Sequence, residues 1–179
     1  FLKLIDRVSS QGRGVIVMVP EISLTPQTVG LFQRRYGNRV AIFHSSLSLG
    51  ERLDEWKRVR NGEARIAVGT RSAVFAPFSD VGLIVMDEEQ EYTYKSESSP
   101  RYHARDVAKF RCATHKSLLV LCSATPSLES YYYALEGRYQ YNKLSARYGI
   151  ARLPEVSVID MNQELEQGNS SILSRALYS

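Results

Sequence analysis

Residues 82–89 read Gly-Leu-Ile-Val-Met-Asp-Glu-Glu, an apolar run that ends abruptly in three carboxylates. A short apolar run without polar alternation is typical of a strand that is buried on both faces, as strands of parallel sheets are. In such sheets, ligands bind beyond the carboxyl ends of the strands. The run therefore predicts a parallel sheet and, directly after one of its strands, a site with carboxylate chemistry.

Similar apolar runs recur on both sides of this one, and amphipathic segments separate them. The other predicted strands cover residues 15–19, 39–43, 65–69 and 118–122. The predicted helices cover residues 1–8, 25–36, 103–114 and 125–136, and a further helix follows residue 48. Because strands and helices alternate, we expect an α/β fold whose parallel sheet carries helices on both faces.

Three of these helices have recognisable start signals. Thr25 and Thr125 are each followed by proline, which is the pattern of an N-cap residue with proline in the first helical position. Ser48 and Glu51 have the spacing of a capping box. We therefore expect helices to begin at these three places.

The alternation weakens after residue 139. Residues 145–171 are rich in Ser, Asn, Gln, Arg and Gly, with one short strand candidate at 156–159. Residues 172–178 have the pattern of a partial helix. We therefore expect one domain over residues 1–144 and a connector over 145–179.

The composition excludes several classes of protein. The 179 residues (20.3 kDa) are 44% hydrophobic and 23% charged, which is ordinary for a globular domain with one sizeable core. Two cysteines are too few for a disulfide framework or a four-ligand zinc site. A net charge of +4 permits a polyanionic partner without requiring one. Since the chain starts with Phe1 and inside a helical pattern, we expect a piece of a longer protein.

The carboxylates that follow residue 86 suit a nucleotide site. Mg²⁺ prefers oxygen ligands, and in P-loop NTPases an Asp in the position of Asp87 helps to hold it. A neighbouring carboxylate such as Glu88 can orient the attacking water. Acidic residues at strand ends are about as often simple helix caps or solvated turns, so this stretch alone leaves both interpretations open.

Ser123, Ala124 and Thr125 follow the next apolar run and favour the first interpretation. An acidic strand end and then Ser-Ala-Thr is the order of motifs II and III in superfamily-two helicases, where the hydroxyl motif resembles a relay between the nucleotide site and the nucleic-acid groove. The alternative is an ordinary N-cap at Thr125, and the two roles are compatible.

Two more segments fit the same order, since residues 19–25 resemble motif Ia and residues 68–73 resemble motif Ib. Backbone amides, hydroxyls and an arginine at strand ends can bind phosphates without reading bases. The predicted DNA contacts are Pro20, Glu21, Ser23, Thr25, Thr70, Arg71 and Ser72.

These motifs, with the runs 87–95 and 100–108, closely resemble the primosomal protein N′ family of replication-restart helicases, which belongs to superfamily two. Further matching segments are residues 19–27, 43–45, 69–77 and 153–156. The resemblance covers essentially the whole chain. It implies a RecA-like lobe of the P-loop NTPase class over residues 1–144, and an inter-lobe connector with the start of the second lobe over 145–179.

The resemblance also implies an activity. It is that of an ATP-dependent DNA helicase of replication restart and primosome assembly, which couples Mg²⁺-ATP hydrolysis to movement on single-stranded DNA. Asp87 would help to hold Mg²⁺ through ATP, Glu88 would polarise the water, and Glu89 and Gln90 would link this site to residues 123–125. The implied partners are single-stranded and forked DNA, replication-restart proteins and single-strand-binding proteins, in the bacterial cytoplasm and nucleoid rather than at a membrane.

An aromatic-rich loop follows the acidic residues. Tyrosines and cations are interleaved there: Tyr92, Tyr94, Lys95, Arg101, Tyr102 and Arg105. Aromatic faces between cations can stack on single-stranded bases, and the resemblance implies a loop that senses DNA and signals to the ATP site. The alternative is a surface loop with tyrosines packed beneath it.

The chain departs from the family pattern in three ways. Position 90 is Gln where the family usually has His, so it can donate and accept a hydrogen bond but cannot take up a proton. No Gly-x-x-x-x-Gly-Lys-Thr loop precedes the first strand, and the second lobe's zinc-binding cysteines are absent. We therefore expect the 179 residues alone to be inactive as an ATPase, with zinc bound only in the second lobe.

Gln90 also keeps an alternative open, namely a DNA-binding or protein-docking module with a degenerate nucleotide site. A third interpretation is an unrelated parallel-sheet enzyme that binds a metal at the acidic residues. It fits the strand order but not the Ser-Ala-Thr and Thr-Arg segments.

Overall fold

The computed structural model describes residues 1–145 and 156–177. They form two compact units, Phe1–Gln140 and Tyr141–Ser179. The first unit contains every residue of the predicted site. The assignment of residues 145–179 to a connector and a second lobe stays a prediction.

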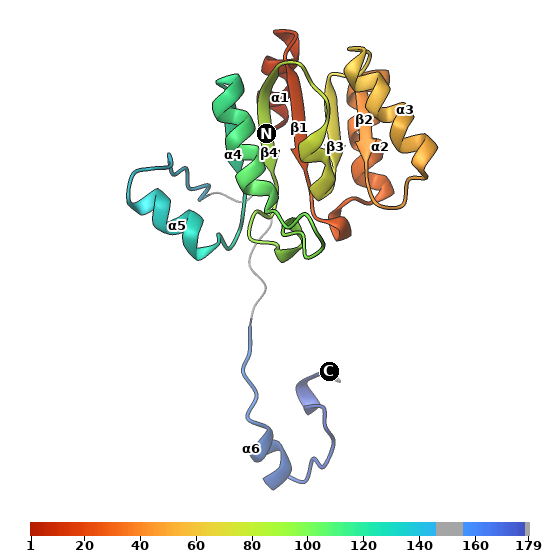
Figure 1. Ribbon diagram of the computed structural model, residues 1–179. Helices are drawn as coiled ribbons and strands as arrows, with labels where there is room; N and C mark the ends of the chain where they lie inside the picture. The colour runs from red at the N-terminus through yellow and green to blue at the C-terminus, as the bar shows by residue number, and fades with distance from the viewer. Residues whose placement is uncertain (146–155, 178–179) are drawn as a thin grey trace. The chain divides into compact units, whose positions relative to one another are not determined.

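The first unit is built on a five-stranded sheet in which all pairs are parallel (Figure 1). The strands are β1 (Gly14–Met18), β2 (Val40–Phe43), β3 (Ile66–Gly69), β4 (Val81–Met86) and β5 (Leu118–Leu121), in the spatial order β2-β3-β1-β4-β5. The prediction of a parallel sheet is confirmed. Because β1 and β4 are neighbours at its centre, the acidic run at the end of β4 lies beside the motif that follows β1.

Helices cover both faces of this sheet, as expected for a RecA-like α/β fold. The helices of the first unit are α1 (Leu2–Ser10), α2 (Pro26–Tyr36), α3 (Leu49–Arg60), α4 (Ala104–His115) and α5 (Leu128–Leu135). Residues from α1 and α2 share one apolar cluster with the odd-numbered residues of β1. Residues from α3 and α4 share the other with the even-numbered ones. The period-two alternation of strand side chains thus divides the core into two layers.

Two of the three predicted helix starts are confirmed. Thr25 caps α2 by accepting a hydrogen bond from the Thr28 amide, and Ser48 forms the predicted capping box with Glu51. The third was misplaced, because α5 begins at Leu128 and its N-cap is Ser127 rather than Thr125. The reason is a tertiary contact of Ser127 with Glu89, described below.

The sequence patterns near the carboxyl end were less reliable. Residues 156–160 form no strand, whereas a helix, α6 (Met161–Glu166), was not predicted. The partial helix is reduced to a short 3-10 turn, Arg175–Leu177. Main-chain and side-chain donors of Arg175 and the Asn169 amide surround the Glu164 carboxylate and lower its pKa to about 2.

A close backbone contact fixes where motif Ib begins. A Cβ atom on Gly69 would lie 2.1 Å from the carbonyl oxygen of Phe43, so only glycine lets β3 approach β2 this closely. The same carbonyl accepts a hydrogen bond from the Thr70 amide at 2.9 Å. Thr70 therefore starts its loop from a fixed point on the sheet.

A histidine caps the helix after the aromatic-rich loop, and we expect it to make stability depend on pH. Nδ1 of His103 accepts a hydrogen bond from the Arg105 amide at 3.1 Å. Burial, assisted by the Arg105 charge, lowers the pKa of His103 below its ordinary value of 6.5. The unfolded chain therefore takes up the proton first, and the stability that the neutral cap contributes is lost as the pH falls from 6.5 through that lowered pKa.

Asn is a good cap that does not titrate, so His103→Asn is expected to keep the roughly 1 kcal/mol that an N-cap contributes and to flatten this acid loss. Urea unfolding of both proteins between pH 7.5 and pH 5 measures it. Equal losses in both proteins would contradict the assignment.

Candidate nucleotide and nucleic-acid site

Asp87 and Glu88 lie directly after β4, at the carboxyl ends of the strands, which point downward in Figure 1. The Asp87 amide donates to the carbonyl of Met18 at 2.9 Å, so the turn is attached to β1 as well as to β4. Glu88 has a φ of +47°, a left-handed conformation that a non-glycine residue adopts at a cost of about 1 kcal/mol. Such strain is often found at functional sites, where it orients a side chain.

The Asp87 carboxylate suits a cation. It is half-buried, and its Oδ1 accepts only the Glu88 amide, at 3.2 Å. Burial, and in addition the Glu88 charge, raises the pKa of Asp87 above its ordinary value. Within the described residues no group of three or more His, Cys, Asp or Glu side chains could hold a metal ion by itself. The hard oxygen donors of two adjacent carboxylates fit Mg²⁺ held jointly with phosphate oxygens.

Gln90 connects these carboxylates to the Ser-Ala-Thr segment. Its Nε2 donates to Oε2 of Glu88 at 2.7 Å, and its Oε1 accepts from the Ser123 hydroxyl at 2.6 Å. The Ser123 oxygen in turn accepts from the Thr125 amide at 2.9 Å. The amide thus uses both of its hydrogen-bonding functions to join the predicted motifs II and III.

Glu89 behaves differently from its neighbours. Its side chain is 1% exposed and points inward, where it accepts the Ser127 amide at 2.7 Å and the Ser130 hydroxyl at 2.9 Å. The Ser127 hydroxyl and Nη1 of Arg105 complete its shell at 3.1 and 3.2 Å. Glu89 was expected to link the acidic turn to residues 123–125. That expectation is corrected, because each hydrogen bond of its side chain goes to Ser127, Ser130 or Arg105, at the starts of α5 and α4.

Arg105 is corrected for the same reason. It was predicted as a cation of the DNA-sensing loop, but its side chain is only 14% exposed and also donates to the hydroxyls of Ser127 and Ser130, both at 3.0 Å. A guanidinium held in this way is a structural partner of Glu89. Ser127 and Ser130 were missed by the sequence analysis.

The aromatic-rich loop has an outer and an inner tyrosine. Tyr92 is 80% exposed, and Lys95 and Arg101 are exposed as well. Tyr94, on the same 3-10 turn (Tyr92–Tyr94), is 1% exposed, and its hydroxyl donates to the carbonyl of Asp87 at 2.7 Å. Burial and nearby carboxylates raise the pKa of Tyr94 far above its ordinary value. The expectation that Tyr94 stacks on bases is therefore wrong.

Tyr102 is half-buried and packs edge-to-face on Phe75, with ring centroids 5.1 Å apart. Phe75 belongs to the 3-10 segment Arg71–Phe75 that follows β3. The aromatic-rich loop therefore lies against the motif Ib segment, and Tyr102 is a packing residue of this contact.

Two of the predicted motif Ia and Ib residues, Glu21 and Thr70, line one hollow of about 490 Å³ at the carboxyl ends of β1, β2 and β3. Glu21, Pro26 and Thr70 line it together with His44, Ser45 and Ser46. Thr70 is 5% exposed, whereas Glu21 and Ser72 are exposed. The structure thus brings the two motifs together around one concave surface.

Several expected phosphate contacts are already used inside the protein. Pro20 is buried, and the Ser23 amide donates to its carbonyl at 3.0 Å. The Thr25 hydroxyl caps α2, and Nη1 of Arg71 donates to carbonyls of the aromatic-rich loop. The amide of Ser23 is therefore not free to bind a phosphate in this conformation, and the oxygen of the Thr25 hydroxyl is already used as an acceptor.

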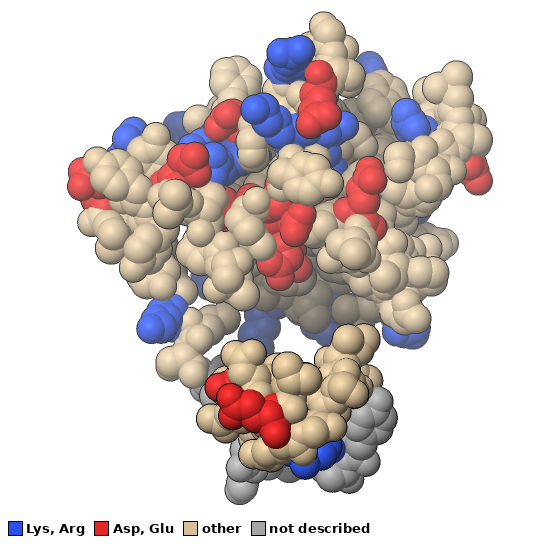
Figure 2. Space-filling view, turned by 90° about the horizontal axis from the view of Figure 1, so that it is seen from below, with Lys and Arg blue, Asp and Glu red and all other residues tan. Residues whose placement is uncertain are grey.

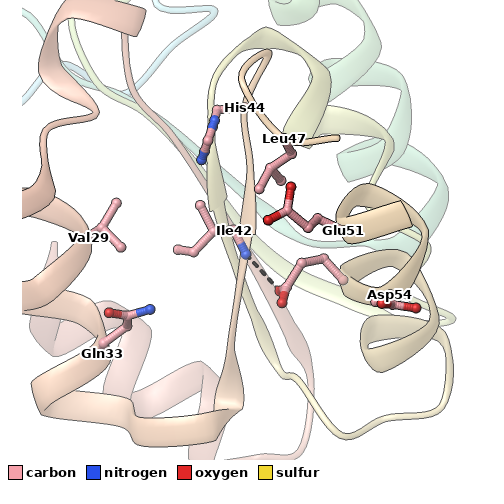
Figure 3. A pocket seen from close by; sticks show the side chains of 8 residues that line it. Val29, Gln33, Ile42, His44, Leu47, Glu51 and Asp54 are labelled. Carbon is pink, nitrogen blue, oxygen red and sulfur yellow. Dashed lines mark hydrogen bonds between the residues drawn. The ribbon is translucent and has the colours of Figure 1, made fainter. Parts of the chain in front are cut away.

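A second hollow, of about 410 Å³, lies between α2 and α3 at the free edge of β2 (Figure 3). Val29, Ile42 and Leu47 form its apolar part, and three carboxylates, those of Glu51, Asp54 and Glu55, line it as well. Glu55 accepts a hydrogen bond from the Ile42 amide at 3.0 Å, so this outward-facing N–H of the edge strand already has a partner. Three carboxylates disfavour phosphates here, so we place no DNA contact in this hollow.

Charge is mixed on the face that contains the carboxyl ends of the strands. Figure 2 shows acidic and basic side chains interspersed on this face, with an acidic group near its centre, rather than one basic surface. An acidic centre fits a cation-assisted nucleotide site better than a site that attracts a polyanion by charge alone. None of the helices in the described part of the chain has the length and apolar character needed to cross a bilayer.

A parallel sheet with an acidic strand end, bridged to a hydroxyl segment after the neighbouring strand, defines a RecA-like helicase lobe. The chain belongs to the DEAD/DEAH box helicase family, whose sequence model matches residues 1–132.

Its relatives at 36–49% identity are replication restart proteins named PriA. The Bacillus subtilis protein is 49% identical over 174 residues, 97% of this chain and 22% of that protein. The Synechocystis protein is 45% identical over 96% of this chain and 21% of its own length. The chain therefore spans about a fifth of the length of these relatives. Among solved structures, the C-terminal domain of Dbp5 from S. cerevisiae matches 70% of this chain and 68% of its own at 15% identity, with a TM-score of 0.49.

Proposed function

We propose that this chain is the first motor lobe of an ATP-dependent replication-restart DNA helicase. The observation that carries the proposal is the Gln90 bridge, which joins Glu88 to Ser123 at 2.7 and 2.6 Å. A change at the nucleotide carboxylates is thereby passed to the segment before α5 through two short hydrogen bonds. Gln performs this link without the protonation that His would allow.

The chemistry would divide between two carboxylates. When bound, Mg²⁺-ATP supplies the transferable phosphoryl group and the charge that neutralises its oxygens. Asp87, whose carboxylate is paired with no cation in the described chain, would help to hold the Mg²⁺. The left-handed backbone of Glu88 fixes the direction of its side chain, and its carboxylate would accept a proton from the attacking water. Glu89 would keep the start of α5 in place.

The remaining parts of the site would come from the rest of the whole protein. The Gly-Lys-Thr loop that binds β- and γ-phosphates does not occur in this sequence, so the 179 residues alone should not hydrolyse ATP. Any zinc would belong to the second lobe. Partner proteins would be those of replication restart and single-strand binding.

On the DNA side, the hollow between motifs Ia and Ib would receive the backbone of a single strand. Thr70 lines this hollow, Arg71 follows it in the chain, and exposed Tyr92 offers a face for one base. Lys95 and Arg101 would add exposed charge beside it. Forked DNA would present such a strand next to a duplex.

The proposal is tested with the full-length protein and a Gln90→Ala variant. We expect ATP turnover that single-stranded DNA stimulates, and a loss of about tenfold in the stimulated rate on losing hydrogen bonds to a charged group. Nucleotide binding should change little, because Asp87 is retained. Steady-state ATPase assays with and without a thymidine oligonucleotide measure this.

Gln90→His, which restores the family's residue, serves as the matched variant and should keep the stimulation. A folded full-length protein that binds DNA but shows no turnover would contradict the motor and leave the DNA-binding module. Turnover that is stimulated equally in Gln90→Ala would contradict the bridge.

A further inference from the structure

Arg71 has two sets of contacts that the phosphate role assigned to it does not explain. It opens the 3-10 segment after β3 and is half-buried. Its Nη1 donates to the carbonyl of Lys95 at 2.7 Å and to the carbonyl of Thr93 at 3.3 Å. Its guanidinium carbon lies 5.9 Å from the centre of the Tyr102 ring. The motif Ib arginine thus holds the aromatic-rich loop.

The two carbonyls that Arg71 holds flank Tyr94. The Tyr94 hydroxyl donates to the main-chain carbonyl of Asp87 at 2.7 Å. A shift of Tyr94 out of the core would therefore break its hydrogen bond to the turn that bears the Asp87 carboxylate. Tyr92 stands on the same turn and is 80% exposed. Any force that moves the backbone at Thr93 or Lys95 therefore acts on both an exposed and a buried tyrosine.

Only one edge of the guanidinium is used by the loop. Arginine has five N–H donors in a planar fork, and the two loop carbonyls take those of Nη1. Among the described residues, Nε and Nη2 of Arg71 have no hydrogen-bond partner, and these two nitrogens form the edge that binds phosphate oxygens in a bidentate manner. The guanidinium also lies over the ring of Tyr102.

We propose that Arg71 is a positioning residue with two working edges. One edge binds a phosphate of single-stranded DNA, and the other holds the backbone on both sides of Tyr94, so that occupancy of the phosphate site is transmitted to the turn that bears Asp87. This role rests on the proposed DNA-dependent ATPase. It differs from a plain phosphate contact because the guanidinium shape, and not only its charge, is required.

Lysine separates the two functions, because its ammonium keeps the charge but has no second edge. In full-length Arg71→Lys, we expect the dissociation constant for a thymidine oligonucleotide to rise about threefold, since one charge-assisted contact remains. The turnover number at saturating DNA should fall about tenfold, in the range of coupling between linked sites. Tyr94→Phe, which removes only the hydroxyl, should lower the same turnover number and leave DNA affinity unchanged.

Hydrogen exchange supplies a readout that does not depend on turnover. In the wild-type protein, the oligonucleotide should slow exchange at the amides of Tyr94 and Lys95, which donate within the 3-10 turn. In Arg71→Lys these amides should exchange faster and respond less to the oligonucleotide. Arg34→Lys, an exposed arginine of α2, is the matched control and should behave as wild type.

The possible outcomes are distinct. If Arg71→Lys lowers affinity but leaves both the saturated turnover number and the exchange of residues 92–95 unchanged, Arg71 is only a phosphate ligand and the proposal is overturned. If wild-type turnover is not stimulated by DNA, the proposed motor fails, and the exchange data alone then decide whether Arg71 holds the loop. Faster exchange in Arg71→Lys supports the hold, and unchanged exchange rejects it.

Discussion

Replacing Glu88 by Gln in the full-length protein is expected to lower the ATP turnover number by about 100-fold or more, the range seen when a general base is removed. Gln keeps the size of the side chain but cannot accept a proton from water. Asp87 stays in place, so the affinity for nucleotide should change little. Steady-state ATPase rates and the binding of a fluorescent ATP analogue measure the two effects separately.

Glu91→Gln is the matched control, because it removes the same charge three residues further along a half-buried segment. We expect the control to keep most of the wild-type turnover. Glu88→Gln that retained more than about a tenth of the wild-type rate would exclude Glu88 as the base, since general base catalysis contributes at least that much.

The backbone at Glu88 bears on how such a variant is interpreted. Glu88 is one of two non-glycine residues with positive φ in the described chain, the other being Lys116 at the end of α4. Two main-chain hydrogen bonds hold its turn: the Asp87 amide donates to the carbonyl of Met18 in β1, and the Glu89 amide donates to the carbonyl of Cys122, directly after β5. The strained residue is therefore fixed by main-chain bonds that Glu88→Gln does not touch, and the variant should fold as the wild type does.

The sheet could be predicted because its signal is local and strong. Runs such as residues 82–86 are long enough to show that apolar and polar residues do not alternate in them. Glycine or proline marks the ends of several of these runs. The strand order, with β1 and β4 at the centre, could not be read from these runs, since it depends on pairing between distant segments. Leu118, predicted to be buried, is 49% exposed at the start of β5, one of the two edge strands.

The candidate site was predictable in its motifs and not in the direction of its side chains. Spacing identified Asp87, Gln90 and Ser123, and the structure joins the last two. Spacing could not show that Tyr94 turns inward while Tyr92 turns outward, because both lie on one short turn whose packing depends on the Asp87 carbonyl. A tyrosine that can donate to a main-chain carbonyl gains from burial, whereas the same residue on the other side of the turn does not.

The start of α5 shows the same limit. Thr125-Pro126 is a good local start signal, yet Ser127 caps the helix because the buried carboxylate of Glu89 binds both the amide and the hydroxyl of Ser127. A signal existed in the sequence, since Ser127 and Ser130 have the spacing of a cap residue and the amide that it accepts. Two adjacent start signals cannot be ranked without the third partner, which lies 38 residues away.

Glu89→Ala is accordingly expected to be the most destabilising of the changes considered, lowering the free energy of unfolding by about 3–5 kcal/mol, because it leaves a buried partner charge uncompensated. Arg105 is 14% exposed and would lose its carboxylate, and the Ser130 hydroxyl would lose an acceptor in a site where it is 7% exposed. As the control, Glu97→Ala removes an exposed carboxylate of the aromatic-rich loop and should change the free energy of unfolding by less than about 0.5 kcal/mol. Urea unfolding followed by circular dichroism measures both.

A double variant distinguishes an uncompensated charge from lost packing. Glu89→Leu with Arg105→Met replaces both ions by apolar groups of similar size, and such replacements are often close to neutral when the remaining donors keep partners. We expect the pair to regain a large part of the stability that Glu89→Ala loses, with the remaining deficit due to Ser127 and Ser130. If the double variant is as unstable as the sum of the two single changes, the ion pair is not what holds the start of α5 on the β4 turn.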